Sequence, residues 1–424
     1  MVDNLPLDGK ISPMIQRKIS KPLQDSLETS PVVLLQGPRQ SGKTTLVRDF
    51  IAQATPRRYM TFDDLPTLAA ARNDPQGFIR GLQGPVIIDE VQRVPDVALA
   101  IKAEVDREKT PGRFLLTGSA RALVLPQLSE ALVGRMEMLT LWPFTQGELL
   151  GCGESFLDRC FSGDLPSVRR SDLTRTDYIC RAAVGGFPEA VKRKGFQQRD
   201  SWFRGYLSTL LQREVRDLSQ IDRLTEIPKL LSIIGSRSAA LLNASTISRE
   251  AGIPNSTLHR YLTLLEAVFL IRFIPAWSAN LGKRLVRSPK VILTDPGLLA
   301  HLTGFSVGNG LGGSVEAGRI LETFVATEVM RQLSWSRQGI SLFHFRTHTG
   351  QEVDLVLEDR KGSLLGIEVK ASETVRAEDF SGLRFLAEAR SKRFQRGILL
   401  YTGAEVVPFG KNLFAVPMAA LWEW

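Results

Sequence analysis

Cysteine and histidine are both scarce in this chain, which has three cysteines and four histidines among its 424 residues. The cysteines form no CxxC pair and the histidines have no zinc-ligand spacing, so the sequence predicts neither a disulfide framework nor a zinc site. This cysteine usage is typical of a reducing compartment, and we expect a cytoplasmic protein.

Long apolar runs are also missing. No uninterrupted apolar segment reaches the ~20 residues of a membrane span, and the first residues contain no apolar stretch of signal-peptide length. A membrane protein is therefore not expected, and residues 1–30 are interpreted as a polar N-terminal leader. The sequence has no fixed-period repeat or low-complexity tract, which excludes a repeat array.

The overall composition is that of an ordinary globular protein, with 43% hydrophobic and 23% charged residues. A chain of 424 residues is long enough for roughly two to four domains. The formal net charge of +9 is mild for this length; it suits a polyanionic partner without requiring one.

Residues 31–50 combine an apolar strand, a glycine-containing loop and an amphipathic stretch. The loop matches GxxxxGK[ST], the pattern of a phosphate-binding loop between a strand and a helix. In such a loop, backbone N–H groups face the β-phosphate, Lys43 would reach the β- and γ-phosphates, and Thr44 would offer a hydroxyl to Mg²⁺. The predicted nucleotide-binding residues of this loop are Gly37, Pro38, Arg39, Gln40, Ser41, Gly42, Lys43, Thr44 and Thr45.

A second apolar segment, residues 85–91, runs into two acidic residues at the end of a predicted strand. Asp89 would bind nucleotide through the Mg²⁺ shell, and Glu90 would act as general base on the attacking water. An ordinary acidic surface turn is the alternative. At the end of the strand predicted in 113–120, Thr117 would place a hydroxyl near the γ-phosphate, unless this is a plain strand-to-loop turn.

The motifs GPRQSGKTTL, VIIDEVQ, LLTGSAR and LVGRMEMLTLWPFTQGEL occur in that order, followed by GGFPEAV, YLSTLLQREVRDL, VILTDPGLLAHLTG and EVDLVLEDRKGSLLGIEVKAS. The chain thereby resembles the bacterial and archaeal AAA-type ATPases that carry an uncharacterised C-terminal domain. The resemblance implies an α/β P-loop NTPase domain with an AAA-like parallel sheet at 31–151. It also implies a helical, winged-helix-like segment at 152–275 and a restriction-endonuclease-like α/β domain at 276–424.

Arg135 matches a basic position of such ATPases. The resemblance implies a contact with the γ-phosphate, made in its own or a neighbouring subunit. A solvated arginine is the alternative.

Residues 243–271 have the spacing of a helix-turn-helix. The exposed positions at the start of its second helix form a poorly basic set for reading DNA: Thr257, His259, Arg260 and Thr263. We therefore prefer packing against the ATPase domain or a partner protein to base reading. The basic run that follows has no acid in it and suits either phosphate contacts or a solvated face: Lys283, Arg284, Arg287 and Lys290.

Two strands are predicted within EVDLVLEDRKGSLLGIEVK, paired as a hairpin in which the numbers of facing residues sum to 722. Asp354 then faces Glu368, and Mg²⁺ is the natural cation between two such carboxylates. Glu322, on the inward face of a helix predicted at 316–333, would complete the metal ligands, and Lys370 would orient the attacking water. This is the arrangement of PD-(D/E)xK nucleases. A binding or structural module with alternating charges on a half-exposed strand is the alternative.

Together these motifs predict an Mg²⁺-dependent ATPase whose nucleotide state controls a C-terminal nuclease acting on nucleic acid. A nucleotide-switched scaffold with a catalytically idle C-terminal domain is the first alternative, and a transcriptional regulator is the second. The predicted cofactors are ATP and Mg²⁺. ATP and ADP are the expected ligands, while nucleic acid, a protein partner and an oligomer stay open. The predicted catalytic residues are Lys43, Glu90, Asp354, Glu368 and Lys370.

Overall fold

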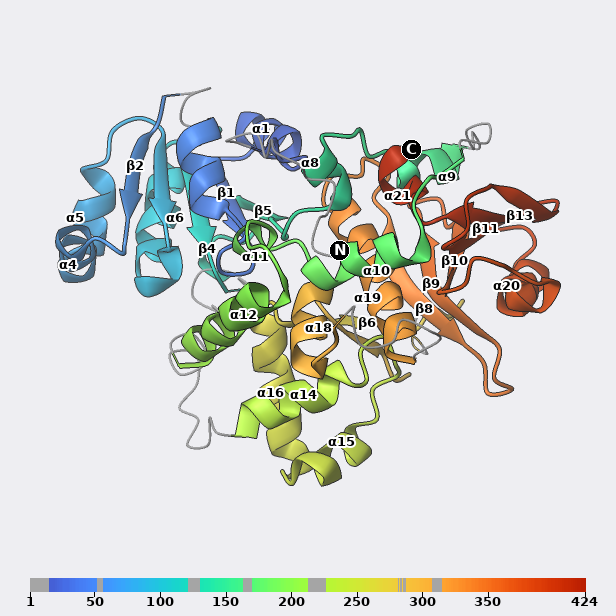
Figure 1. The fold of residues 1–424 in the computed structure, drawn as a ribbon. Coiled ribbons are helices and arrows are strands. Elements are labelled where there is room, and N and C mark those ends of the chain that lie inside the picture. Colours follow the sequence, from blue (N-terminus) through green and yellow to red (C-terminus); the bar gives the residue numbers. More distant parts are fainter. Residues whose placement is uncertain are drawn as a thin grey trace.

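The computed structural model describes residues 15–51, 56–120, 130–162, 170–212, 226–280, 282, 284, 287–306 and 315–424. Figure 1 shows three parts: a sheet with its helices in blue and cyan, a mostly helical part in green and yellow, and a second sheet in orange and red. The helical part lies below and between the two sheets.

The first sheet has five parallel strands in the order β2-β3-β4-β1-β5. Their bounds are β1 (Val32–Gln36), β2 (Arg58–Thr61), β3 (Val86–Asp89), β4 (Phe114–Gly118) and β5 (Met136–Thr140). The interior strand β1 is apolar almost throughout, as expected for a strand with both faces covered. This confirms the predicted parallel α/β sheet.

Helices cover both faces of this sheet. On one face lie α1 (Ser20–Thr29) and the helical segment made of α2 (Lys43–Thr45) and the π-helical η1 (Leu46–Ile51), which pack on Val33 and Leu35. On the other face, α4 (Leu65–Asn73), α5 (Pro75–Arg80) and α6 (Val97–Arg107) pack on Val32 and Leu34, with the short η2 (Val91–Arg93) after β3. The helix α1 lies within the segment interpreted as a leader; residues 1–14 are outside the described part.

The middle of the chain is helical, as predicted, but it also holds two strands. Antiparallel pairing joins β6 (Ile271–Ile274) to β7 (Lys290–Leu293), so the boundary predicted between residues 275 and 276 falls between paired strands. The helices are α8 (Gln146–Leu150), α9 (Phe156–Ser162), α10 (Arg175–Val184), α11 (Pro188–Val191), α12 (Phe196–Leu210), α14 (Ile227–Gly235), α15 (Ala244–Ala251), α16 (Asn255–Ala267) and α18 (Pro296–Thr303).

The helix-turn-helix spacing corresponds to α15 and α16, which are joined through Gly252 in the left-handed conformation. The second helix buries Leu258, Leu262 and Leu265 in the large core that it shares with the neighbouring helices. Most of the DNA-facing candidates are on its other side: His259, Arg260 and Thr263 are exposed and Thr257 is half-buried.

The second sheet has six strands in the order β12-β13-β11-β10-β9-β8. The predicted hairpin register is confirmed, because Leu364 pairs with Glu358 and Ile367 with Leu355. The helices are α19 (Val315–Gln332), which matches the helix predicted at 316–333, η6 (Ala377–Phe380), α20 (Ser381–Ala389) and α21 (Ala420–Glu423). The strands are β8 (Ser341–Arg346), β9 (Glu352–Glu358), β10 (Leu364–Lys370), β11 (Phe394–Tyr401), β12 (Val407–Gly410) and β13 (Leu413–Pro417).

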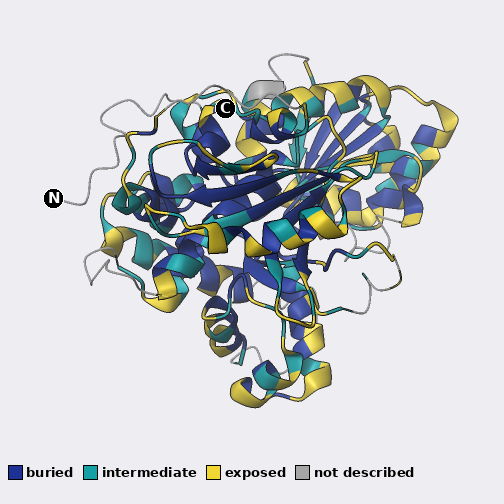
Figure 2. Cartoon of the chain, turned by 90° about the vertical axis from the view of Figure 1, so that its right-hand side faces the viewer, coloured by how far each residue is buried: buried dark blue, intermediate teal, exposed yellow. Residues whose placement is uncertain are grey.

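Most strands are buried in the interior of the molecule, whereas β2, β5 and β12 are partly exposed, and the outer faces of the helices are exposed (Figure 2). On the second sheet, Leu355, Leu365 and Ile398 pack in the core with α19, whereas Val356 and Leu399 pack with α20. Within the described ranges, no helix combines the length and the apolar character needed to cross a bilayer.

Candidate nucleotide-binding site and its links

The phosphate-binding loop leaves the carboxyl end of β1, the position where open α/β sheets bind ligands. The Gly37 amide donates a hydrogen bond to the Gly118 carbonyl (3.3 Å) at the end of β4. A Cβ on Gly37 would lie 2.2 Å from the Leu141 carbonyl oxygen, so no other residue fits there. Gly42 closes the loop with φ +96°, a conformation that favours glycine.

Two residues of the loop, Lys43 and Ser41, have buried polar side chains. The Lys43 ammonium lies across the loop, where it donates to the carbonyls of Gly37 (2.9 Å) and Pro38 (2.8 Å). The Ser41 hydroxyl is fully buried and has no hydrogen-bond partner among the described residues. A buried hydroxyl without a partner costs free energy, which an anionic oxygen in the loop would recover.

The outer side of the loop faces the helical part of the molecule. Half-buried Arg39 and exposed Gln40 line a cavity of about 690 Å³ together with residues of α12. Thr45 is exposed at the start of the helical segment that follows. Arg39 and Gln40 therefore lie on the side of the loop that faces α12.

The predicted magnesium ligands are hydrogen-bonded to each other. Thr44 Oγ1 donates to Asp89 Oδ2 (2.8 Å), and the Tyr59 hydroxyl donates to the same oxygen (2.7 Å). Burial, followed by the hydrogen bond to Asp89, raises the pKa of Tyr59 and keeps it a donor. Hydroxyl and carboxylate oxygens are what Mg²⁺ prefers, so Thr44 and Asp89 fit the ion as a pair.

Glu90 adopts a left-handed backbone conformation (φ 58°), which is uncommon for a residue with a side chain and occurs preferentially at functional sites. Its carboxylate accepts hydrogen bonds from Ser119 Oγ (3.3 Å) and from the side-chain amide nitrogen Nε2 of Gln92. The Thr117 hydroxyl accepts from the Glu90 amide (3.2 Å) and donates to Asp89. Thr117 therefore orients the two acidic residues. Its hydroxyl, predicted to lie near the γ-phosphate, is hydrogen-bonded between Asp89 and the Glu90 backbone.

Arg135 lies at the wrong end of the sheet for its predicted contact in the same subunit. It precedes Met136, which pairs with Val32 at the start of β1, whereas the loop follows the end of β1. The length of the strand, about 13 Å at 3.3 Å per residue, separates the two edges. Arg135 instead forms a double hydrogen bond with Asp106 (2.6 and 3.0 Å). A γ-phosphate contact within one subunit is contradicted.

Comparison with known families assigns the first part of the chain. The profile described as "AAA domain" matches residues 29–150, and two profiles described as "Domain of unknown function" match 175–308 (DUF8612) and 317–421 (DUF4143). "Uncharacterized protein Rv2008c" of Mycobacterium tuberculosis and "Uncharacterized protein Mb2031c" of Mycobacterium bovis are each 30% identical over 414 residues, which is 96% of this chain and 85% of theirs. This chain belongs to their family.

The first part of this AAA-domain protein is an AAA-type ATPase domain, which confirms the predicted class. Two solved structures of RuvB from Thermotoga maritima, a single-residue variant and the "RUVB HOLLIDAY JUNCTION BRANCH MIGRATION MOTOR", are each 20% identical to this chain. The aligned part covers 61% of this chain and 90% of each RuvB chain, with TM-scores of 0.29 and 0.28.

Arg17 joins the phosphate-binding loop of the AAA domain to the exit segment, which is residues 142–150 after β5. Its guanidinium donates to the Ser41 carbonyl (2.9 Å), the Trp142 carbonyl (2.5 Å) and the Glu148 carboxylate (3.1 Å). The side chain is buried and also lies over the Phe144 ring at 4.5 Å. The sequence motifs gave no indication of this residue, because it lies in the segment interpreted as a leader.

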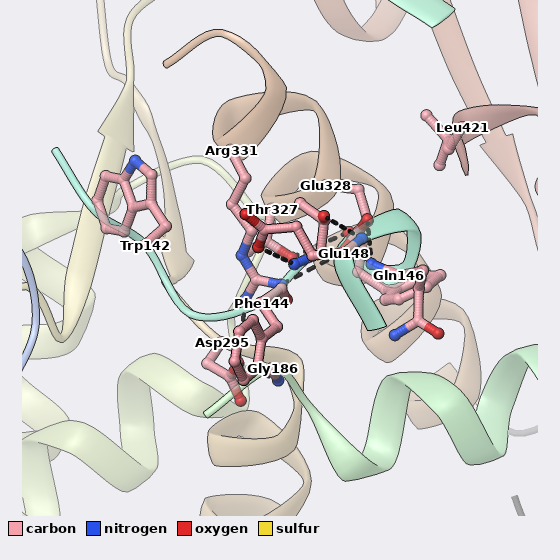
Figure 3. Close-up of polar contacts among 12 residues, drawn as sticks. Trp142, Phe144, Gln146, Glu148, Gly186, Asp295, Thr327, Glu328, Arg331 and Leu421 are labelled. Atoms are coloured by element: carbon pink, nitrogen blue, oxygen red, sulfur yellow. Dashed lines mark hydrogen bonds and ion pairs between the residues drawn. The ribbon is translucent and has the colours of Figure 1, made fainter. Parts of the chain in front are cut away.

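A buried polar cluster continues from this segment into the rest of the molecule (Figure 3). Arg331 Nη1 donates to the Phe144 carbonyl (2.7 Å), and Glu328 Oε2 accepts from the Gln146 amide (3.0 Å). Arg331 Nη2 pairs with Asp295 (3.0 Å), the N-cap of α18. The exit segment of the AAA domain is thus fixed to α18 and α19 by hydrogen bonds away from water.

Glu154 makes the stability of this cluster depend on pH. It accepts hydrogen bonds from the Gly147 amide (3.0 Å) and the Thr145 hydroxyl (2.9 Å). Burial and then the nearby Glu328 raise the pKa of Glu154 to about 8, above the model-compound value of 4.5. The folded state therefore holds a proton that the unfolded state releases, and stability falls as pH rises between these values, by at most about 1.4 kcal/mol per pH unit.

We expect Glu154→Gln to flatten this pH dependence, because glutamine is neutral at every pH. Urea unfolding of the wild type and the variant at pH 6 and pH 8 measures the effect. The loss of stability on going to pH 8 should be smaller in the variant. Equal losses in the two proteins would show that Glu154 titrates normally.

The predicted C-terminal site has its carboxylates together, but a lysine lies among them. Asp354 Oδ2 accepts from the Val369 amide (3.0 Å), which places it beside Glu368 as the register requires. Lys290 Nζ lies 2.9 Å from Asp354 Oδ1 and 2.9 Å from Glu322 Oε1. No cluster of three or more His, Cys, Asp or Glu side chains in the described part could hold a metal ion. The Mg²⁺ site expected from Glu322, Asp354 and Glu368 stays a prediction, and in this arrangement the Lys290 ammonium lies between two of its three carboxylates.

The structure also gives other contacts to Lys370 and to the basic run of residues 283–290. Lys370 lies on the same strand as Glu368, β10, but its ammonium pairs with Asp379 (2.9 Å). In the basic run, Arg284 pairs with Glu358 (2.7 Å), Lys290 is buried among carboxylates, and Arg287 donates to the Arg346 carbonyl (3.4 Å). Lys283 lies outside the described residues. Arg284 and Lys290 are used for internal ion pairs, which contradicts a phosphate-binding run.

Proposed function

We propose that this protein is an ATP-driven conformational switch, in which the AAA domain binds and hydrolyses MgATP and passes its nucleotide state to the helical and C-terminal parts. Nucleotide binding and hydrolysis are the general activity of an AAA-type ATPase domain. The observation that carries the proposal is Arg17, which contacts the phosphate-binding loop at Ser41 and the exit segment at Trp142 and Glu148.

The loop residues have separate roles in this proposal. Lys43 would exchange its loop carbonyls for the β- and γ-phosphates, and the Ser41 hydroxyl would donate to a phosphate oxygen. Thr44 and Asp89 would hold Mg²⁺, which screens the negative charge of the phosphates when bound. Glu90 would accept the proton of the attacking water, with its carboxylate held by Ser119 and Gln92.

Movement of the loop would reach the rest of the molecule through buried groups. A loop that closes on phosphate changes the position of the Ser41 carbonyl, and Arg17 must follow it or lose that bond. Its other donors hold Glu148 and Trp142 in the exit segment. Phe144 and Gln146 of the same segment are bonded to Arg331 and Glu328 of α19.

Hydrogen exchange with and without MgATP tests the binding and the transmission separately. In the wild type we expect slower exchange in 37–45 and changed exchange in 142–150 and α19. Lys43→Ala should lose both responses, and Arg17→Gln should keep the first and lose the second. Arg107→Gln, which changes an exposed arginine of α6, is the matched control.

Two results would overturn the proposal. Normal ATP binding by Lys43→Ala would show that the phosphate-binding loop does not bind ATP as proposed. A full response of α19 in Arg17→Gln would remove the transmission through Arg17.

A metal-dependent nuclease, which would require Lys290 to leave the carboxylates, is the second candidate function, because Asp354 and Glu368 lie together on paired strands. The order α19, β8, β9, β10, α20 and β11, with β10 parallel to β11, also supports a nuclease-like fold. Its test is cleavage of labelled single- and double-stranded DNA and RNA with Mg²⁺ or Mn²⁺, with and without ATP. Cleavage that is lost in Asp354→Ala would establish the activity, and its absence would favour an interaction scaffold.

The helical part supports an interaction role within either candidate. The helices α14, α15 and α16, with an isolated bridge from Leu241 to Lys290 and the strands β6 and β7, follow the order of a winged helix. Its second helix buries one face in the shared core and exposes few basic groups. Packing between the domains therefore suits this unit better than base reading.

A further inference from the structure

Lys290 is a buried lysine with three carboxylates at hydrogen-bond distance. Its ammonium nitrogen lies 2.9 Å from Glu322 Oε1, 3.0 Å from Glu352 Oε1 and 2.9 Å from Asp354 Oδ1. The lysine side chain is only 3% exposed. An ammonium has three N–H donors, so three carboxylate oxygens at these distances satisfy it fully.

Lys290 offsets part of the negative charge of the cluster, in which one ammonium lies among three carboxylates. Burial alone would lower the pKa of Lys290, but Asp354, Glu322 and Glu352 together raise it above its usual range, so the group stays charged. Burial also opposes the charge of Asp354, yet Lys290 and its hydrogen bonds hold the pKa of Asp354 below its usual value. For Glu368, burial and then the charge of Asp354 raise the pKa well above its usual value. The site therefore already contains its cation.

Lys290 comes from outside the sheet that carries the carboxylates. Asp354 belongs to β9 and Glu322 to α19, whereas Lys290 is the first residue of β7. Its backbone pairs with Ile274 of β6 and forms a bridge to Leu241. The middle part of the chain thus fixes where the ammonium lies.

We propose that Lys290 is a built-in cation that occupies the place of a divalent metal among Asp354, Glu322 and Glu352. A metal ion could enter only if the ammonium left, and an ammonium left buried without its partners is strongly unfavourable. The C-terminal site is consequently closed to metal while β7 stays paired with β6. Asp354, Glu322 and Glu352 cannot hold a metal ion and the Lys290 ammonium at the same time. The ion pairs of Lys290 also hold the middle and C-terminal parts of the chain together.

Mn²⁺ binding to the full chain in the absence of nucleotide tests this inference. The wild type, Asp354→Asn, Lys290→Met and the double variant are titrated with MnCl₂, and free Mn²⁺ is followed by electron paramagnetic resonance. We expect equal binding by the wild type and Asp354→Asn. Lys290→Met should bind one additional Mn²⁺, the double variant should lose it, and only Lys290→Met should gain an Asp354-dependent rise in its unfolding midpoint with Mn²⁺.

Exposed Lys392→Met is the charge-matched control and should bind Mn²⁺ like the wild type. A wild-type Mn²⁺ site that Asp354→Asn lacks would overturn the inference, as would a folded Lys290→Met variant without an additional site. If Lys290→Met does not fold, the comparison of the wild type with Asp354→Asn still decides. Because no nucleotide is present and the signal depends on Asp354, neither result bears on the ATPase proposal.

Discussion

Glu90→Gln should lower the rate of ATP hydrolysis by about 10²- to 10⁴-fold while ATP binding changes little. Glutamine has the same size, and its carbonyl oxygen can still accept the hydrogen bonds from Ser119 and Gln92. It cannot accept the proton of the attacking water. Phosphate release at saturating ATP measures hydrolysis, and titration with a fluorescent nucleotide measures binding.

The control for this variant is Glu28→Gln, which alters an exposed glutamate of α1 away from the loop. It should hydrolyse ATP at the wild-type rate. Wild-type turnover in Glu90→Gln would refute the assignment of Glu90 as general base. A loss of binding equal to the loss of hydrolysis would instead assign Glu90 to the nucleotide-binding residues.

Arg331→Met should lower the free energy of unfolding by about 3 to 5 kcal/mol. The arginine is 1% exposed and pairs with Glu328 (3.2 Å) and Asp295 (3.0 Å), both of which are fully buried. Methionine fills similar space but leaves both carboxylates without their cation, and the Phe144 carbonyl loses its donor as well. Urea unfolding, with its midpoint and slope, measures the change.

Arg237→Met provides the comparison, because Arg237 forms a double hydrogen bond with Glu250 (2.6 and 2.7 Å) at the surface. An exposed pair contributes about 0 to 1 kcal/mol, so this variant should be only slightly destabilised. Similar shifts in the two variants would mean that burial adds nothing to the contribution of Arg331.

The parts of the site that follow one another in sequence were predictable. The strand, loop and helix around Lys43 and the strand ending in Asp89 and Glu90 are local patterns, and the strand order only brings their ends to the same edge. The hairpin register that sets Asp354 beside Glu368 was predictable for the same reason, because a short connection leaves one natural pairing.

The missed residues all reach their partners from distant segments. Tyr59 contacts Asp89 from 30 residues away, Arg17 contacts Glu148 from 131, and Lys290 contacts Asp354 from 64. No spacing rule links such pairs. In the sequence Lys290 belongs to a basic run without acids, since the acids that surround it are on α19 and β9.

The contact of Arg135 with the γ-phosphate within one subunit fails for a different reason, which is the direction of a strand, and a contact in a neighbouring subunit stays a prediction. The sequence motif places Arg135 just before β5, but it does not indicate at which edge of the sheet β5 begins. Because β5 runs parallel to β1, Arg135 is at the edge opposite the loop. The family resemblance therefore identified the domain more securely than the role of this side chain.

The bonds between the exit segment and α19 also constrain the order in which a newly synthesised chain can fold. The partner of Gln146, Glu328, is synthesised 182 residues later, and the partner of Phe144, Arg331, is synthesised 187 residues later. At 5 to 20 residues per second, a ribosome takes roughly 10 to 40 s to add that length. The AAA domain can complete its sheet during this interval, but its outgoing segment has no partner yet. Its attachment to the remainder of the protein is consequently a late docking step, which can occur only after α19 has been synthesised.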